Sequence, residues 1–240
     1  MCEILQEAKR RRNKIQKAVI SWASSNMRNF PWRKERDPYK TLVTEILLRR
    51  TTASAVFRIY EKFFARYSTI DRLANAEEEE LKALLSTIGY HVQRAKILKE
   101  ISTFLVQKYG GEIPRTLEEL LKIPHVGPYI SRAILSFCYG VPAAVVDSNV
   151  ERIIRRMFSN HLTEKAPLKL IQKIADTLVP KREHTIYNFG LLDLGALVCR
   201  YGSPSCIKCP LRHSCDYGHK QFTMNCFEAK AILRTKLQKH

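Results

Sequence analysis

Four cysteines near the end of the sequence are spaced closely enough to bind a metal centre. They follow the pattern C-x6-C-x2-C-x5-C and are Cys199, Cys206, Cys209 and Cys215. Four thiolates in so short a segment can bind one tetrahedral zinc ion or one cubane iron–sulfur cluster. Zinc sites usually contain two separated C-x2-C pairs, whereas this pattern contains a single pair. The remaining cysteines are expected to be ordinary thiols, and they are Cys2, Cys138 and Cys226.

A tight turn between two helices is predicted in the run L-K-I-P-H-V-G-P-Y, which starts at Leu121. The first helix should end before Pro124 and the second should begin at Pro128. Proline suits the first turn of a helix because its missing N–H would have had no partner there. Backbone amides at such a helix start can bind a phosphate oxygen. The hairpin is therefore a candidate phosphate-binding site.

An acidic residue, Asp147, comes directly before the next predicted helix. Ser148 and Glu151 have the spacing of a capping box, in which the serine side chain would cap this helix. This pattern predicts that the carboxylate of Asp147 is left free for another role. A phosphate-binding turn followed shortly by a free acid suggests chemistry on a nucleic acid.

A second acidic residue, Glu45, lies in the apolar middle of a helix predicted to start at Pro38. An exposed glutamate paired with Arg49 one turn later would contribute roughly a few tenths of a kcal/mol. The apolar neighbours leave little polar surface for it, however, and they are Val43, Ile46, Leu47 and Leu48. A carboxyl group in such surroundings can act as an acid, because burial disfavours its charged form.

The composition is that of a globular and strongly basic protein. The 240 residues are 45% hydrophobic and 27% charged, and the formal net charge is +18. This length fits one large domain or two intertwined smaller ones. The charge predicts binding to a polyanion, with DNA or RNA as the first candidates. No run resembles a membrane span or a signal peptide, so we expect a cytoplasmic protein, associated with the nucleoid in a prokaryote.

The hairpin run, followed by V-V-D-S-N-V, resembles the helix-hairpin-helix and downstream aspartate of the base-excision DNA glycosylases. That superfamily includes endonuclease III, the adenine glycosylase MutY and the thymine–DNA mismatch glycosylases. The spacing of the four cysteines is similar to the one that binds their 4Fe–4S cluster. The similarity extends from about residue 15 to Cys215. One departure is His125, because the family usually has glycine after the hairpin proline, and glycine adopts positive φ more easily.

This resemblance implies an all-α, two-lobed fold. A six-helix barrel that contains the hairpin would span residues 27–136. A second lobe, made of residues 1–26 and 137–215, would hold the 4Fe–4S cluster, and a cleft between the lobes would receive a flipped nucleotide. The remaining residues, 216–240, would form a basic tail about one helix long.

The resemblance also implies roles for three residues in hydrolysis of an N-glycosidic bond. Asp147 would stabilise the positive charge that develops on the sugar and help to activate water. Glu45 would hydrogen-bond or protonate the departing base, as in the adenine and thymine mismatch glycosylases. Tyr129 occupies the position at which bifunctional members carry a nucleophilic lysine. The protein should therefore be a monofunctional glycosylase without efficient lyase activity.

Three further groups are implied to contact DNA. The end of the Glu45 helix would enter the duplex and contact the orphaned base; it consists of Arg49, Arg50, Thr51 and Thr52. The hairpin would bind phosphate through His125, Val126 and Gly127. The basic run after the turn at Gly89 would contact phosphates with Gln93, Arg94 and Lys96, although a solvated basic face is an equal alternative.

The leading substrate is thymine or uracil opposite guanine in double-stranded DNA, and the protein is expected to act as a monomer. An adenine glycosylase that acts opposite 8-oxoguanine or guanine is the alternative, although MutY proteins continue into a further domain that reads 8-oxoguanine. A third hypothesis is that the protein is an iron–sulfur DNA-binding module without catalytic activity. The retained Asp147 argues against it, because a pure binder gains nothing from a carboxylate that faces phosphates.

Overall fold

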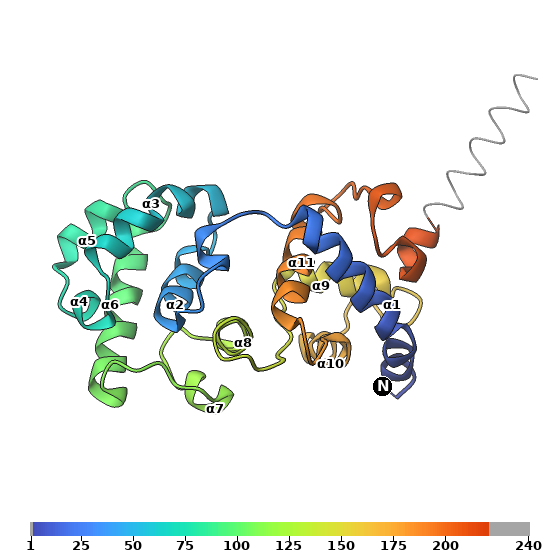
Figure 1. Ribbon diagram of the computed structural model, residues 1–240, viewed down its shortest axis with the longest axis horizontal. Coiled ribbons are helices and arrows are strands. Elements are labelled where there is room, and N and C mark those ends of the chain that lie inside the picture. Colours follow the sequence, from blue (N-terminus) through green and yellow to red (C-terminus); the bar gives the residue numbers. More distant parts are fainter. Residues whose placement is uncertain (1, 221–240) are drawn as a thin grey trace, which may run out of the picture. The chain divides into compact units, whose positions relative to one another are not determined.

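The computed structural model describes residues 2–220, which form helices joined by loops (Figure 1). Within this range there is no β-strand, so the predicted all-α class is confirmed. The predicted basic tail lies outside the described residues from position 221 onward. The described residues fall into two compact units. One spans Asn29–Ala143, and the other combines the residues up to Arg28 with those from Ala144 onward.

The Asn29–Ala143 unit contains the hairpin and the helix of Glu45. Its helices are α2 (Pro38–Leu47), α3 (Ala53–Arg66), α4 (Ile70–Ala74), α5 (Glu78–Leu85), α6 (His91–Tyr109), α7 (Leu117–Leu120) and α8 (Pro128–Phe137), preceded by a 3-10 turn, Pro31–Arg33. Helices α4 and α5 pack on α6, and α2 packs on α8.

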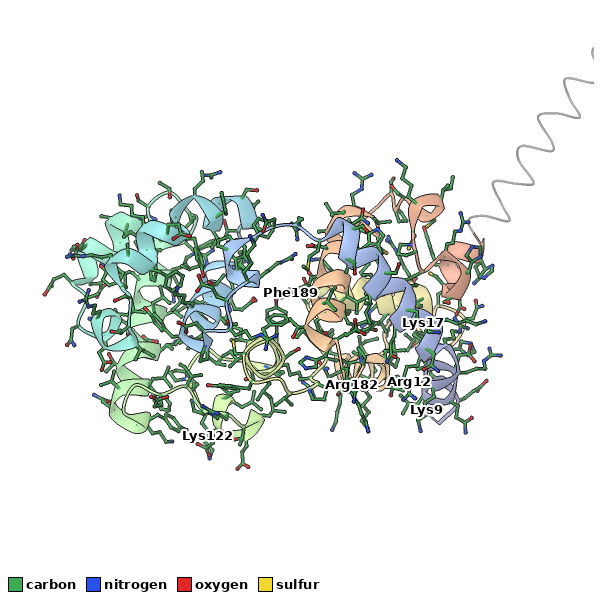
Figure 2. The ribbon with its side chains drawn as sticks, in the orientation of Figure 1. Lys9, Arg12, Lys17, Lys122, Arg182 and Phe189 are labelled. Carbon is green, nitrogen blue, oxygen red and sulfur yellow. The ribbon has the colours of Figure 1, made fainter. Side chains whose placement is uncertain are left out.

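The other unit holds Asp147 and the four cysteines. Its helices are α1 (Cys2–Asn26), α9 (Ser148–Met157), α10 (Leu168–Leu178) and α11 (His184–Leu197), followed by the 3-10 turns η2 (Cys206–Lys208) and η3 (Arg212–Ser214). One face of α1 packs on α10 and α11 through the buried Ile15 and Val19. The exposed cations of α1 include Lys9, Arg12 and Lys17 (Figure 2).

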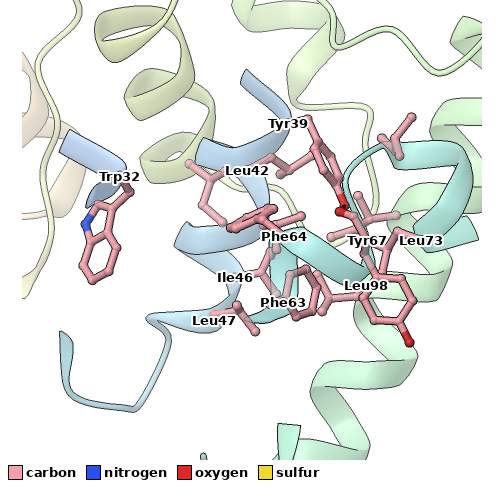
Figure 3. Packing of buried hydrophobic residues seen from close by; sticks show 14 of the residues in the cluster. Trp32, Tyr39, Leu42, Ile46, Leu47, Phe63, Phe64, Tyr67, Leu73 and Leu98 are labelled. Carbon is pink, nitrogen blue, oxygen red and sulfur yellow. Dashed lines mark hydrogen bonds between the residues drawn. The ribbon is translucent and has the colours of Figure 1, made fainter. Parts of the chain in front are cut away.

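Local sequence signals explain why α2 begins where it does. Asp37 accepts hydrogen bonds from the backbone N–H groups of Tyr39 and Lys40, and Pro38 occupies the first helical position. Both features favour a helix start. The inward face of α2 then packs Leu42 and Ile46 into an aromatic core, which includes Phe63, Phe64 and Tyr67 (Figure 3).

None of the helices within residues 2–220 combines the length and the apolar character that crossing a membrane requires.

Candidate active site and cysteine centre

Asp147 caps the N-terminus of α9. Its Oδ1 accepts a hydrogen bond from the backbone N–H of Val150 at 2.8 Å, and its Oδ2 accepts one from the side-chain amide of Asn149 at 2.8 Å. The prediction that Ser148 caps this helix is therefore wrong, and so is the expectation that Asp147 takes no part in the cap. The extended backbone at Asp147 directs its carboxylate to the first turn, and aspartate caps a helix as well as serine does. Since each carboxylate oxygen can accept two hydrogen bonds, this cap orients the group and leaves acceptor capacity for a ligand.

The same carboxylate is linked to the first cysteine of the motif through two side chains. Asn149 donates to Asp147 with its amide, and its own Oδ1 accepts from Arg152 at 2.8 Å. Arg152 also donates to the backbone carbonyls of Gly195 and Cys199, each at 2.8 Å. The start of α9 is thus fixed to the end of α11, from which Cys199 follows.

Gly195 allows α9 and α11 to approach closely at this point. A Cβ atom added to Gly195 would lie 2.5 Å from the Cβ and 3.2 Å from the Cα of Asn149. A larger residue at this position would have to displace the first turn of α9. The position of Asp147 therefore depends on a glycine in another helix.

The four cysteines of the motif lie near one another at the end of this unit. Each is half-buried and none forms a disulfide. Burial raises the pKa of Cys206, and it raises the pKa values of Cys209 and Cys215 to about 11 and about 12, with smaller increases from the neighbouring thiols of the motif. Four partly buried thiols in one short segment are suited to a positively charged centre, because a bound metal removes their protons.

N–H groups donate hydrogen bonds to two of the four cysteine sulfur atoms. Arg156 donates to the Sγ of Cys199 at 3.3 Å and to the carbonyl of Arg200 at 2.8 Å. The backbone N–H of Gly218 donates to the Sγ of Cys215 at 3.4 Å. Such donors stabilise thiolates bound to an iron–sulfur centre. The donor set therefore fits a centre bound through four thiolates.

Glu45 lies inside the helical core of the Asn29–Ala143 unit, with 6% of its surface exposed. Its neighbours Leu42 and Ile46 are each 1% exposed. The alternative of an exposed glutamate paired with Arg49 does not fit this burial. Arg49 instead donates a hydrogen bond to the backbone carbonyl of His125.

The hairpin has the expected turn between two helices. Helix α7 ends at Leu120, before Pro124, and Pro128 is the first residue of α8. His125 adopts positive φ, at 62°, so it takes the backbone conformation that glycine would favour. Its Nε2 contacts the carboxylate of Glu100 at 2.5 Å, which ties the turn to α6.

Tyr129 is the second residue of α8, and it is half-buried against the core of its unit. Val126, in the turn, is buried with 6% exposure, while Gly127 is half-buried and caps α8 with extended backbone. The amide of Val126 donates to the carbonyl of Ile123 at 3.2 Å. The Val126 amide is therefore already used within the turn.

Arg94 has a structural role. The basic residues around it in the sequence predict a surface cation instead. It is 4% exposed, and its guanidinium donates to the carbonyls of Ile46 at 2.8 Å, Gly89 at 2.7 Å and Arg49. These contacts satisfy the last carbonyls of α2 and fix the turn that follows. A guanidinium buried in this way is not placed to contact a phosphate, so Arg94 does not fit its predicted role.

A surface pocket of about 460 Å³ adjoins this turn. Arg50 and Tyr90 both have positive φ, and the Arg50 guanidinium lies 5.8 Å from the centroid of the Tyr90 ring. The pocket is lined by Ile46, Arg49, Arg50, Tyr90, Gln93, Arg94 and Ile97. Members of two groups predicted to contact DNA, Arg49 and Arg50 in one and Gln93 in the other, thus line the same pocket.

The structure places the predicted site residues in two groups, one in each unit. Glu45, Tyr129 and the predicted DNA contacts lie in the Asn29–Ala143 unit, whereas Asp147 and the cysteines lie in the other. Sequence reasoning missed Asn149 and Arg152. Their spacing of three residues on one helix, directly after Asp147, was a usable signal, because such residues are neighbours on a helix surface.

Comparisons with known proteins identify the family of this chain. The family model of the HhH-GPD superfamily base excision DNA repair proteins matches residues 43–181. A thymine/uracil-DNA glycosylase of Methanothermobacter thermautotrophicus is 37% identical, over 84% of this chain and 92% of its own.

Two solved structures are similar to most of this chain. That of a thermostable thymine-DNA glycosylase has a TM-score of 0.83 and 36% identity, and the match covers 88% of this chain and 98% of that chain. A non-covalent endonuclease III–DNA complex has a TM-score of 0.76 and 26% identity, and its match covers 90% and 98%. The predicted resemblance to helix-hairpin-helix DNA glycosylases is confirmed. The chain belongs to the HhH-GPD superfamily of base excision DNA repair proteins.

Proposed function

We propose that this protein is a monofunctional DNA glycosylase that removes thymine or uracil mispaired with guanine. The observation that carries the proposal is the similarity to the Methanothermobacter thymine/uracil-DNA glycosylase over most of both chains. Binding to DNA follows from the family. The preferred partner would be a duplex with a mismatched base, bound by a protein monomer.

Asp147 is proposed to act on the sugar. Hydrolysis breaks the bond between the sugar carbon and the base nitrogen, and positive charge develops on the sugar as the base leaves. A fixed carboxylate stabilises that charge and accepts a proton from the attacking water. The two N–H donors on Asp147 support this role because they orient the group before substrate arrives.

Glu45 is proposed to contact the departing base. Its burial in α2, one helical turn before the Arg49–Arg50 segment that is proposed to contact the bases, supports this role. A base that leaves as an anion needs a hydrogen bond or a proton on its developing charge. If Glu45 supplies this proton, it regains one from solvent, and Asp147 releases to solvent the proton that it takes from the attacking water.

Tyr129 is proposed to make the enzyme monofunctional. Strand cleavage through a Schiff base requires an amine that attacks the sugar carbon. The phenol of Tyr129 cannot form an imine. Lys122 lies before the hairpin turn and pairs with Glu119 at 2.5 Å, so it is held by another partner.

Contacts to DNA are proposed at two surfaces of the Asn29–Ala143 unit. The amides at the start of α8, beside His125, Val126 and Gly127, would hold a phosphate. Arg49, Arg50 and Thr51 would contact the bases where the target has left the stack. Gln93 lines the same pocket as Arg49 and Arg50. Arg94 supports this surface by holding the turn.

A 4Fe–4S cluster is proposed to be bound by Cys199, Cys206, Cys209 and Cys215. Within residues 3–220 no three His, Cys, Asp or Glu side chains are arranged to hold a single metal ion. The single C-x2-C pair of the motif and the N–H donors to the sulfur atoms of Cys199 and Cys215 support the cluster. When bound, the cluster would link η2, η3 and the end of α11 into one structural unit.

A panel of duplexes tests the proposed substrate. G·T, G·U, A·8-oxoguanine and A·G duplexes would be incubated with excess protein, and base release would be scored by heating the product in alkali. We expect release from G·T and G·U. Release of adenine alone would replace the proposal by an adenine glycosylase, and binding without any release would indicate a non-catalytic module.

A further inference from the structure

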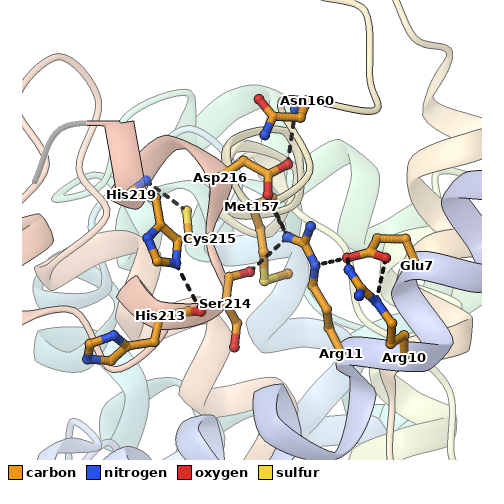
Figure 4. A network of polar contacts seen from close by, with 11 residues as sticks. Glu7, Arg10, Arg11, Met157, Asn160, His213, Ser214, Cys215, Asp216 and His219 are labelled. Carbon is orange, nitrogen blue, oxygen red and sulfur yellow. Dashed lines mark hydrogen bonds and ion pairs between the residues drawn. The ribbon is translucent and has the colours of Figure 1, made fainter. Parts of the chain in front are cut away.

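Arg11 of α1 joins segments that lie far apart in the sequence (Figure 4). Its guanidinium donates hydrogen bonds to the carbonyls of Met157, at the end of α9, and Ser214, in η3, both at 3.1 Å. It also pairs with the carboxylate of Asp216 at 2.7 Å and with Glu7 one turn earlier in α1. The Arg11 side chain is 17% exposed, so this is a largely buried cation with partners in three segments.

The partner Asp216 is held as firmly as Arg11. Its side chain is 6% exposed, and its second oxygen accepts from the backbone N–H of Asn160 at 3.0 Å. The Phe158 ring lies 5.3 Å from the Arg11 guanidinium carbon. Removing one member of such a buried pair leaves the other charge without compensation, which is costly.

Asp216 directly follows Cys215, the last cysteine of the motif. The Cys215 carbonyl accepts from the backbone N–H of His219 at 3.0 Å, and its Sγ accepts from that of Gly218. From Cys206 to Cys215 the single buried side chain is that of Leu211. A segment with so few buried apolar contacts has little stability of its own, so its position depends on contacts such as the one to Arg11.

We propose that Arg11 is a positioning residue. It holds the segment Ser214–Gly218, which contains Cys215, against α1 and so helps to retain the metal centre. The inference rests on the proposed 4Fe–4S cluster. A released Cys215 would leave one iron without its protein ligand, and chelators would then remove iron faster. With Arg11 in place, Cys215 returns to the same position after each transient opening.

Arg10 offers a matched control. It pairs with the same Glu7, at 2.7 Å, but its side chain is 76% exposed. Arg11→Met and Arg10→Met therefore remove the same charge from neighbouring positions, and both disturb Glu7. In the loaded protein, iron release to a chelator would be followed by absorbance. We expect Arg11→Met to release iron about tenfold faster or more, as for a lost hydrogen bond between charged groups, and Arg10→Met to match wild type.

Amide hydrogen exchange at Ser214–Gly218 supplies a readout that does not depend on iron. Arg11→Met should accelerate exchange there, and Asp216→Asn should do the same if the arginine variant does not fold. If wild-type protein took up no iron, the cluster proposal would be refuted. Amide hydrogen exchange would still test whether Arg11 holds the segment Ser214–Gly218 in place. Wild-type exchange in both variants, or an equal effect of Arg10→Met on both readouts, would overturn the inference.

Discussion

At Asp147, one carboxylate caps a helix and is proposed to stabilise the reacting sugar. Asparagine caps helices about as well as aspartate, so Asp147→Asn should retain the bond to the Val150 amide while losing the charge. We expect the variant to fold and to bind a G·T duplex. Base release should fall about 100-fold or more, the size of effect expected when a general base is removed. Single-turnover release, measured beside binding, checks both expectations.

Ser148→Ala is the control for this substitution. Ser148 is exposed and does not cap α9, so its loss should change the free energy of unfolding by less than about 0.5 kcal/mol. A change of about 1 kcal/mol, typical of a lost cap, would mean that serine and not aspartate caps the helix in solution. Asp147→Asn with full activity would refute the catalytic assignment.

Tyr129→Lys tests the reaction type. The substitution places an amine at the second position of α8, where partial burial should lower the pKa of the lysine and leave some of it neutral. Borohydride should then trap a covalent protein–DNA adduct with the variant and not with wild type. Efficient trapping by the unmodified protein would show that another amine acts as the nucleophile.

At the scale of elements, α9 connects the proposed catalytic acid with the cysteine centre. Asp147 lies at its start, Arg152 and Arg156 contact the Cys199 region, and the carbonyl of Met157 accepts from Arg11. A displacement of α9 should therefore affect base release before it unfolds the protein.

Gly195→Ala provides that displacement. The added methyl group would lie 2.5 Å from the Cβ of Asn149, so the first turn of α9 must move. Such overpacking costs about 1–3 kcal/mol, and we expect base release to fall by about 10-fold or more, because positioning of reacting groups is sensitive to small shifts. Melting temperature and single-turnover release would be measured together.

Gly190→Ala is the matched control, because its Cβ would lie 2.8 Å from that of Ala23, between α11 and α1. It should lower stability with a much smaller loss of base release per molecule folded. Equal losses in the two variants would mean that activity reports general stability and not the position of Asp147.

Much of the element structure could be predicted from the sequence because its signals are local. Pro38 and Pro128 mark helix starts, and both are the first residues of their helices in the structure. The cap of α9 was not predicted correctly, because Asp147 and Ser148 are both good caps and adjacent. Arg94 looks like a surface cation in sequence. Its burial depends on the carbonyls at the end of α2, which are distant in the chain.

At the scale of the whole molecule, charge is spread unevenly between the two units. Residues 2–28 and 144–220 contain 19 Lys and Arg against nine Asp and Glu, whereas residues 29–143 contain 18 against 13. DNA affinity should fall steeply as the salt concentration rises. The logarithm of the binding constant should fall with the logarithm of the salt concentration, with a slope of about −0.9 for each phosphate neutralised. Titrations of a matched and a G·T duplex at several salt concentrations would measure this slope. An affinity that does not depend on salt would mean that the lysine and arginine side chains do not neutralise DNA phosphates.

Family membership was predictable at this scale because the motifs that carry it lie in short stretches. The roles of the individual residues and the predicted domain ranges stay predictions, since they depend on bound DNA and on a metal centre. Local patterns cannot determine which base is removed. That choice depends on small differences in shape and hydrogen bonding around a flipped nucleotide.

The most direct test of the account follows one end-labelled G·T duplex with excess protein, with and without hot alkali. We expect hot alkali to cleave the strand at the mispaired thymine and the untreated strand to stay intact. An A·T duplex should stay intact with and without alkali. An untreated strand cut at the thymine would contradict the monofunctional assignment. A G·T duplex that stays intact even after alkali would contradict the proposed function.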